Sequence, residues 1–198
     1  MRHILITGAS GGIAQAMIPL LKDDFLILLG RDAQKIEELY ASHSKKAIYE
    51  IDISKAADLA ALVKKIYQDY GKIDVLVNNA GYAIYGDFEN FSEDQVRAMF
   101  DVNLFALMAL CRLVGKEMKA AKAGHIINIV SMSGKIASAK SSIYSATKLR
   151  PWAFPIPSAW SWRPIMWGSP LSIQAQWPQV FLTWRTQMAA TKRVFRPF

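Results

Sequence analysis

The sequence contains a single cysteine, Cys111, so an internal disulfide is excluded. Its neighbours Leu107, Leu110 and Val114 are apolar, which favours a packed thiol over a reactive one. No apolar run approaches the length that spans a membrane, and the N-terminal stretch before Gly8 is too short for a signal peptide. We therefore expect a cytoplasmic protein without a membrane partner.

Acidic residues are missing from the C-terminal part of the chain. Residues 149–198 contain six Lys and Arg and no Asp or Glu, whereas residues 1–148 contain 18 basic and 16 acidic residues. All six tryptophans and seven of the eight prolines also lie in 149–198. A break this sharp divides the chain into a domain, residues 1–148, and a tail, residues 149–198.

The net charge of +8 comes mostly from this tail, so it does not describe the domain. Basic segments rich in tryptophan can bind single-stranded nucleic acid, and the tail contains Trp160, Trp162, Arg163 and Trp167. No repeated or groove-forming pattern accompanies them. We expect no nucleic-acid partner.

Apolar runs of strand length alternate with segments of helical period through residues 1–148. Strands are expected at 3–7, 25–29, 47–51, 73–77 and 126–130. Helices fill the intervals, with Asp32 and Ser54 as candidate N-caps and a capping box at Ser92 and Gln95. Five strands joined by helical crossovers predict an α/β fold, a Rossmann-type doubly wound parallel sheet truncated after the fifth strand.

The helix that begins at the capping box should run to about Lys122, and its middle is unusually apolar. From Val102 to Val114 almost every position is apolar, so the helix has little polar surface to offer water. We expect it to pack against a second subunit of a homo-oligomer. The alternative is that it is buried within one domain.

A glycine-rich turn joins the first strand to the first helix, where backbone N–H groups can bind pyrophosphate. Gly8 permits the tight turn, Gly12 lets a ligand approach the backbone, and Ala14 is small enough for helix packing. The turn predicts a dinucleotide site. The residues expected to bind the cofactor here are Gly8, Ser10, Gly11, Gly12 and Ile13.

Four further polar residues follow in order along the chain: Asn103, Ser131, Tyr144 and Lys148. Together with the glycine turn and the segment N-N-A-G at 78–81, they resemble the short-chain dehydrogenase/reductase family in order and approximate spacing. Tyr144 and Lys148 are four residues apart and so share one helical face. A cation beside a phenol favours the phenolate, as a general acid/base requires.

The resemblance implies a role for each member of this set. Tyr144 would move the proton on the substrate oxygen while hydride passes between the nicotinamide and a substrate carbon. Ser131 would hold that oxygen by a hydrogen bond. Lys148 would also grip the nicotinamide ribose, and Asn103 would hold a water in a proton relay.

The end of the second strand bears on the choice between NADP and NAD. An acid there would bond the ribose 2′-hydroxyl of NAD, whereas an arginine would accept the 2′-phosphate of NADP. Gly30 stands where family members that use NAD usually have an acid, Arg31 follows it, and Asp32 has a competing role as a helix cap. This order favours NADP over NAD.

The resemblance also places residues around the adenosine part of the cofactor. These are Asp52 and Ile53 beside the adenine, and Asn79, Ala80 and Gly81 along the adenosine side. The three histidines, His3, His43 and His125, have no neighbours that suggest a metal, and we expect no metal site.

The tail lacks the continuation that the resemblance implies, because Pro151, Pro155 and Pro157 follow Lys148 too closely for the helix to extend. A shift of the reading frame accounts for this. In the shifted frame, each new codon takes the third base of one existing codon and the first two bases of the next. Read in this way, the bases that encode Arg150 to Trp162 can encode an amphipathic helix with acidic residues. Ser169 to Phe181 can likewise encode a strand and a Pro-Gly turn. We hypothesise that one base was lost near codon 148, so that the tail is an out-of-frame translation.

These features predict an NADP-dependent oxidoreductase that interconverts a small carbonyl compound and an alcohol. Two alternatives stay open: a catalytically inactive truncated remnant, and a nucleotide-sensing regulator on the same fold. The sensor is disfavoured because it would not need the complete set from Asn103 to Lys148. The substrate is not specified, since residues 82–90 supply only one wall of its pocket.

Overall fold

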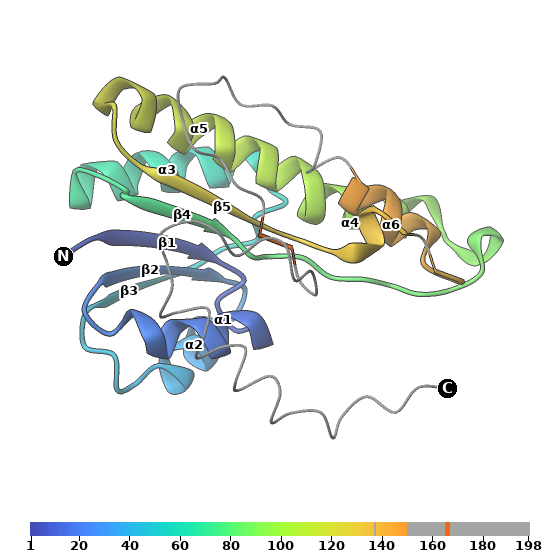
Figure 1. The fold of residues 1–198 in the computed structure, drawn as a ribbon, viewed down its shortest axis with the longest axis horizontal. Helices are drawn as coiled ribbons and strands as arrows, with labels where there is room; N and C mark the ends of the chain where they lie inside the picture. The colour runs from blue at the N-terminus through green and yellow to red at the C-terminus, as the bar shows by residue number, and fades with distance from the viewer. Residues whose placement is uncertain (137, 150–164, 167–198) are drawn as a thin grey trace.

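A computed structural model of the chain describes residues 1–136, 138–149 and 165–166. Its centre is a parallel sheet with the strand order β3-β2-β1-β4-β5-β6 (Figure 1). The strands are β1 (His3–Thr7), β2 (Phe25–Gly30), β3 (Lys46–Glu50), β4 (Val75–Asn78), β5 (His125–Val130) and β6 (Ile165–Met166). The five predicted strands are confirmed to within two residues at each end.

The last strand comes from the tail rather than from the predicted domain. β6 contains two residues and pairs in parallel with β5, Ile165 opposite Ile129 and Met166 opposite Val130. The predicted sheet ended at β5, so this short strand is an addition to it. It covers part of the edge of β5 that would otherwise be open.

Helices cover both faces of the sheet (Figure 1). On one face lie α1 (Gly12–Met17), its 3-10 continuation Ile18–Leu21, and α2 (Ala33–Leu39); on the other lie α3 (Ala56–Tyr70) and α5 (Ala106–Ala121). Each face has its own apolar core, because side chains of a strand alternate between the two faces. Leu5 and Leu76 pack with α3 and α5, whereas Ile4 and Ile6 pack with α1 and α2.

Local signals set most of the helix ends. The carboxylate of Asp32 accepts a hydrogen bond of 2.8 Å from the Lys35 amide at the start of α2, as predicted. The predicted cap at Ser54 is wrong: the N-cap of α3 is Lys55. The hydroxyl of Ser54 instead donates to the carboxylate of Asp52, so it is engaged before the helix begins.

The capping box opens one long continuous helix. It consists of α4 (Glu93–Phe100), a π-helical segment Asp101–Phe105, and α5, 29 residues in all. Contrary to our expectation from the sequence, this helix is, by length and composition alone, long and apolar enough to cross a membrane. Its inner face packs into the domain core through Leu110, Val114 and Met118, as the core helix of a folded domain does.

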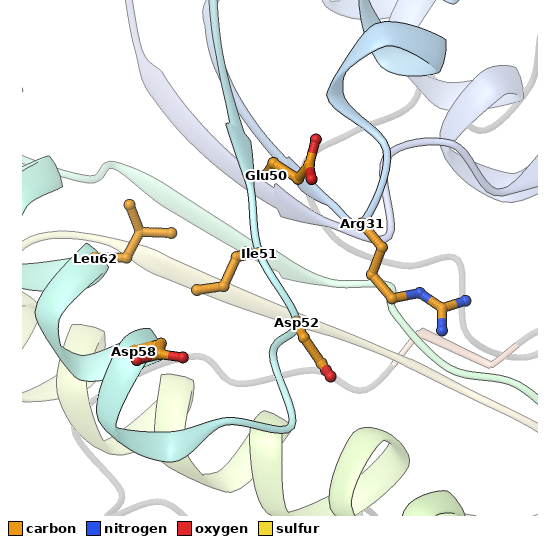
Figure 2. Close-up of a pocket in the computed structure, with 6 residues that line it drawn as sticks. All are labelled: Arg31, Glu50, Ile51, Asp52, Asp58 and Leu62. Carbon is orange, nitrogen blue, oxygen red and sulfur yellow. The ribbon is translucent and has the colours of Figure 1, made fainter.

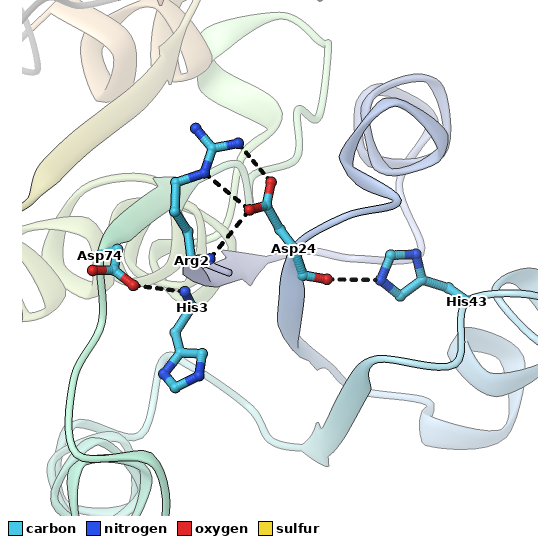
Figure 3. A network of polar contacts seen from close by, with 5 residues as sticks. All are labelled: Arg2, His3, Asp24, His43 and Asp74. Atoms are coloured by element: carbon cyan, nitrogen blue, oxygen red, sulfur yellow. Dashed lines mark hydrogen bonds and ion pairs between the residues drawn. The ribbon is translucent and has the colours of Figure 1, made fainter.

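A polar network joins the amino-terminal ends of neighbouring strands, at the end of the sheet where the chain begins (Figure 3). The guanidinium of Arg2 forms two hydrogen bonds with the buried carboxylate of Asp24, at 2.9 and 2.6 Å. A ring nitrogen of His43 lies 3.2 Å from the Asp24 carbonyl, and Asp74 accepts from the His3 amide. These bonds tie the start of β1 to the segments that precede β2 and β4, and the segment before β2 to that before β3, at the end of the sheet opposite the glycine turn.

Candidate functional site

The strand order changes direction between β1 and β4, and ligands of such sheets bind beyond the carboxyl ends of the strands at that point. The hydroxyl of Thr7, at the end of β1, accepts hydrogen bonds of 3.0 Å from the backbone amides of Asn79 and Ala80, which follow β4. The side-chain amide of Asn79 donates in turn to the carbonyls of Thr7 and Gly8. The glycine turn and the N-N-A-G segment therefore form one unit.

Two glycines of the turn meet different requirements. Gly8 has a φ of +64°, and a Cβ there would come within 2.8 Å of the Ala80 Cα, so a side chain is excluded by both conformation and space. At Gly12 a Cβ would meet no atom within 4 Å. The space beside Gly12 is therefore open, as the approach of a dinucleotide to the backbone requires.

A pocket of about 540 Å³ lies where β2 and β3 end, lined by Arg31, Glu50, Ile51, Asp52, Asp58 and Leu62 (Figure 2). Arg31 and Asp52, both predicted cofactor residues, follow β2 and β3 and line this pocket. Hydrogen bonds from Ser54, together with nearby cations, hold the pKa of Asp52 below its ordinary value. The side chain of Ile53 is buried in the core instead of lining the pocket. Among the described residues that line it, Arg31 is the only cation.

Gly30, just before Arg31, faces α2 at close range. A Cβ at this position would come within 2.5 Å of the Ile36 Cδ1. Because that atom is the end of a flexible side chain, a small shift of Ile36 would relieve the contact. An acidic side chain at residue 30 would require Ile36 to move.

Asn103 lies in the π-helical segment and is fully buried. Its side-chain oxygen accepts from the Tyr82 amide at 2.9 Å, and its side-chain nitrogen donates to the Tyr82 carbonyl at 2.8 Å and to the Thr147 hydroxyl at 3.0 Å. π-Helical turns occur frequently at functional sites. Here the segment directs Asn103 between the loop after β4 and the helix α6 (Ser142–Leu149).

Tyr144 and Lys148 lie on α6, one turn apart. The ammonium of Lys148 is 6.0 Å from the centre of the Tyr144 ring, and a Cβ on Gly81 would lie 3.1 Å from that ammonium. Lys148 is 6% exposed, and burial lowers its pKa to about 8. Within the described residues it has no hydrogen bond or ion pair, so its charge is available to a ligand beside Gly81.

Ser131 follows β5 and is the N-cap of a short 3-10 turn, Met132–Gly134, that packs against α6. Its hydroxyl oxygen accepts from the Ser133 amide at 3.2 Å, which leaves the hydroxyl hydrogen free to donate. The structure thus brings Ser131, Tyr144, Lys148 and Asn103 to the same end of the sheet as the glycine turn.

Exposed apolar side chains concentrate on the two segments that flank Tyr144. In the described part of the chain, five of the nine large exposed apolar side chains lie within 82–91 and 131–140: Tyr82, Tyr85, Phe88, Met132 and Ile136. The ring centre of Tyr85 is 6.1 Å from that of Tyr144. The two segments are joined by a hydrogen bond from the Gly86 amide to the Lys140 carbonyl. We call these five exposed side chains the apolar wall, and Tyr85 is the member that lies against Tyr144.

Sequence reasoning did not assign a role to Thr7 or to Thr147. Thr7 could have been found, because a hydroxyl at a strand end can bond the backbone of an adjacent strand end. Thr147 gave no separate signal, because its contact with Asn103 spans 44 residues of chain. Both residues are fully buried or nearly so.

The fold and the glycine turn define a nucleotide-binding protein of the Rossmann class. The family model for short chain dehydrogenase matches residues 2–150. The chain therefore belongs to the short-chain dehydrogenase family.

Curated relatives include an uncharacterized oxidoreductase of Staphylococcus saprophyticus, 34% identical in an alignment of 149 residues that covers 73% of this chain and 61% of that protein. The ketoacyl reductase HetN of Nostoc is 35% identical over 74% of this chain and 53% of its own length. A 3-ketodihydrosphingosine reductase of Bacteroides thetaiotaomicron is 32% identical over 73% and 52%. The matched part thus spans between half and three fifths of these relatives.

Solved structures agree with the fold. A metagenomic short-chain oxidoreductase in complex with NADP has a TM-score of 0.70 at 33% identity, covering 77% of this chain and 74% of its own. An NAD⁺-bound xylitol dehydrogenase has a TM-score of 0.72 at 25% identity, covering 77% and 61%. Proteins of this fold thus include both NADP and NAD complexes.

Proposed function

We propose that the protein is an NADP-dependent oxidoreductase that interconverts a carbonyl compound and an alcohol. The observation that carries the proposal is the buried ammonium of Lys148, which lies next to both Gly81 and Tyr144 at the point where the strand order changes direction. A buried cation without a protein partner costs free energy unless a ligand uses its charge. Such a group at the mouth of a nucleotide site supports catalysis rather than packing.

Tyr144 and Lys148 on α6 and Ser131 after β5 have separate roles in proton transfer. Tyr144 donates a proton to the substrate oxygen during reduction and takes it back during oxidation, and the Lys148 ammonium lies one turn away on the same helix. Ser131 donates a hydrogen bond to the same oxygen. A nicotinamide cofactor held at this site would supply or accept the hydride.

Asn103 acts differently from these three groups, because its side-chain amide is engaged with Tyr82 and Thr147. We assign it the positioning of α6 relative to the loop after β4. The water relay that the family resemblance implies stays a prediction.

The cofactor would lie between the glycine turn and the pocket at Arg31. Gly8, Ser10, Gly11, Gly12 and Ile13 would hold the pyrophosphate, and Asn79, Ala80 and Gly81 the adenosine side. Arg31 would accept the 2′-phosphate of NADP. The other charged residues of this pocket, Glu50, Asp52 and Asp58, are acidic and would repel a phosphate. Preference for NADP therefore depends on the guanidinium of Arg31.

The apolar wall supports a substrate with an apolar group next to its carbonyl. Tyr85 is 62% exposed although it lies against Tyr144, so a bound apolar group would cover it. We propose a homo-oligomer on the apolar composition of the long helix, on which Phe105 is 54% exposed. A cytoplasmic location, without a metal or a nucleic-acid partner, is part of the same proposal.

The test measures NADPH oxidation by the full chain with a panel of carbonyl compounds that range from polar to apolar, alongside the Tyr144→Phe variant. We expect turnover, with lower KM for the apolar carbonyls, and a loss of turnover in Tyr144→Phe without loss of cofactor binding. Cofactor binding without turnover of any carbonyl would favour the nucleotide sensor. Absence of both would favour the inactive remnant.

A further inference from the structure

The glycine turn is held from the side of α2 by a residue outside the turn. The hydroxyl of Tyr40 donates a hydrogen bond of 2.6 Å to the carbonyl oxygen of Ala9. Tyr40 is the C-cap residue of α2 and is 5% exposed, and Ala9 is fully buried. The bond therefore joins two groups that water does not reach. Burial raises the pKa of Tyr40 to about 12, which keeps the hydroxyl protonated and able to donate.

The carbonyl that Tyr40 holds determines where the next amide points. The peptide between Ala9 and Ser10 is trans, so its N–H is directed opposite to its C=O. Because the C=O is drawn toward Tyr40, the Ser10 N–H is directed to the other side of the turn. Ser10 is one of the proposed pyrophosphate residues, and its amide makes no hydrogen bond to another backbone group within the described residues.

The neighbouring carbonyls of the turn are held as well. Those of Thr7 and Gly8 accept from the Asn79 side chain, and that of Ser10 accepts from the Gln15 side chain at 2.8 Å. Tyr40 completes this set at Ala9. A carbonyl released from such a bond could turn toward the ligand, where its partial negative charge would repel a phosphate.

We propose that Tyr40 is a positioning residue for the cofactor: its hydroxyl fixes the Ala9 carbonyl and thereby presents the Ser10 amide to the pyrophosphate. This inference rests on the proposed nucleotide binding but not on any catalytic step. Its effect is confined to ligands that contain the pyrophosphate.

The experiment compares Tyr40→Phe with Tyr67→Phe in the full chain. Tyr67 is a matched control, because its hydroxyl is also buried yet has no hydrogen-bond partner among the described residues. Isothermal titration calorimetry measures the Kd of NADP⁺, of ADP-ribose, which keeps the pyrophosphate, and of 2′-AMP, which lacks it.

We expect Tyr40→Phe to raise the Kd of NADP⁺ and ADP-ribose about tenfold, the equivalent of one lost hydrogen bond, and to leave that of 2′-AMP unchanged. Tyr67→Phe should change none of the three. Equal Kd values in wild type and Tyr40→Phe would overturn the inference. So would a parallel rise for 2′-AMP, which would indicate a general structural defect.

Two further outcomes have defined meanings. If the wild-type chain binds none of the three ligands, the proposed nucleotide binding fails, which is distinct from a failure confined to Tyr40. If Tyr40→Phe does not fold, the titrations are repeated in sucrose, which favours the folded state, and with O-methyltyrosine at position 40, which keeps the ring but cannot donate. Unaltered binding of NADP⁺ by that variant would also overturn the inference.

Discussion

The side-chain nitrogen of Asn103 donates a 3.0 Å hydrogen bond to the hydroxyl of Thr147, and this bond connects the long helix to α6. Thr147 in turn donates to the carbonyl of Tyr144 at 2.7 Å. One buried amide is thus linked through a single threonine to the backbone of the proposed proton donor. The position of α6 depends on a contact between residues that are far apart in the chain.

Replacement of Asn103 by leucine should lower the free energy of unfolding by roughly 2–4 kcal/mol, because the polar groups it joins would lose their partners. Urea denaturation measures the change. The same substitution at Asn90, which is exposed and has no side-chain hydrogen bond in the described structure, should cost less than about 0.5 kcal/mol. Similar losses at both positions would contradict the role of the Asn103 contacts.

Lys148 should destabilise the domain at neutral pH, because its charged form is buried. Burial lowers its pKa from 10.5 to about 8, so between these values the unfolded state binds more protons than the folded state and stability rises with pH. Lys148→Met should therefore be more stable than wild type at pH 7, by about 3 kcal/mol at most. This advantage should shrink as the pH rises from 8 to 10.5.

Chemical denaturation across this pH range tests the prediction for Lys148. The control is Lys64→Met, which makes the same substitution at an exposed position of α3. A Lys148→Met variant that is less stable than wild type at pH 7 would show that the ammonium has a stabilising protein partner.

Arg31→Ala should raise the Kd of NADP⁺ about 10- to 100-fold and leave that of NAD⁺ nearly unchanged, since only NADP⁺ has the 2′-phosphate that a guanidinium binds. Titration calorimetry with both cofactors provides the comparison. Arg112→Ala, at an exposed position of α5 outside the pocket, is the matched control. Equal weakening of both cofactors by Arg31→Ala would remove the basis for preferring NADP.

Asp24→Asn should lower the free energy of unfolding by about 1–3 kcal/mol at pH 7, because the buried carboxylate bonds the Arg2 guanidinium. That hydrogen bond holds the pKa of Asp24 below its ordinary value of 3.8. The stabilisation is therefore present above pH 4 and is lost as the pH falls through the lower folded value. Denaturation of wild type, Asp24→Asn and the exposed neighbour Asp23→Asn at pH 7 and pH 3 should show a loss of stability only for Asp24→Asn, and a smaller loss at pH 3 than at pH 7.

Restoring one base near codon 148 should produce a chain that continues α6 and is more stable and more active than the chain with the tail 149–198. The family match over residues 2–150 ends two residues beyond Lys148, which supports this expectation. DNA sequencing and the intact mass of the protein decide the matter. An unbroken frame that encodes the written tail, together with the corresponding mass, would refute the frame-shift hypothesis.

The strands and most helix ends could be predicted because their signals are local. Apolar runs marked the five strands of residues 1–148, and Asp32 and Gln95 marked helix starts through bonds that span three residues. Ser54 misled the prediction for an equally local reason, since its hydroxyl bonds Asp52 instead of capping α3. The two-residue strand β6 lay outside the prediction, because its pairing with β5 depends on a distant segment.

The motif residues of the site could be found from their order in the sequence, but their burial and their packing contacts could not. Periodicity places Tyr144 and Lys148 on one helical face; it does not reveal that Lys148 is 6% exposed beside Gly81. Nor does it show that Ile36 occupies the space next to Gly30. Burial and desolvation depend on which distant segments pack together, and those contacts exist only in the folded chain.

Order along the chain was thus enough to establish the alternating α/β architecture, the glycine turn and the set of polar residues from Asn103 to Lys148. Folding decided which of these groups meet: the Asn79 side chain on the glycine turn, the Asn103 amide on Thr147, and the Tyr40 hydroxyl on the Ala9 carbonyl. These bonds span 31 to 71 residues. A parallel sheet brings such distant segments together at the carboxyl ends of its strands, and no pattern of neighbouring residues encodes that encounter by itself.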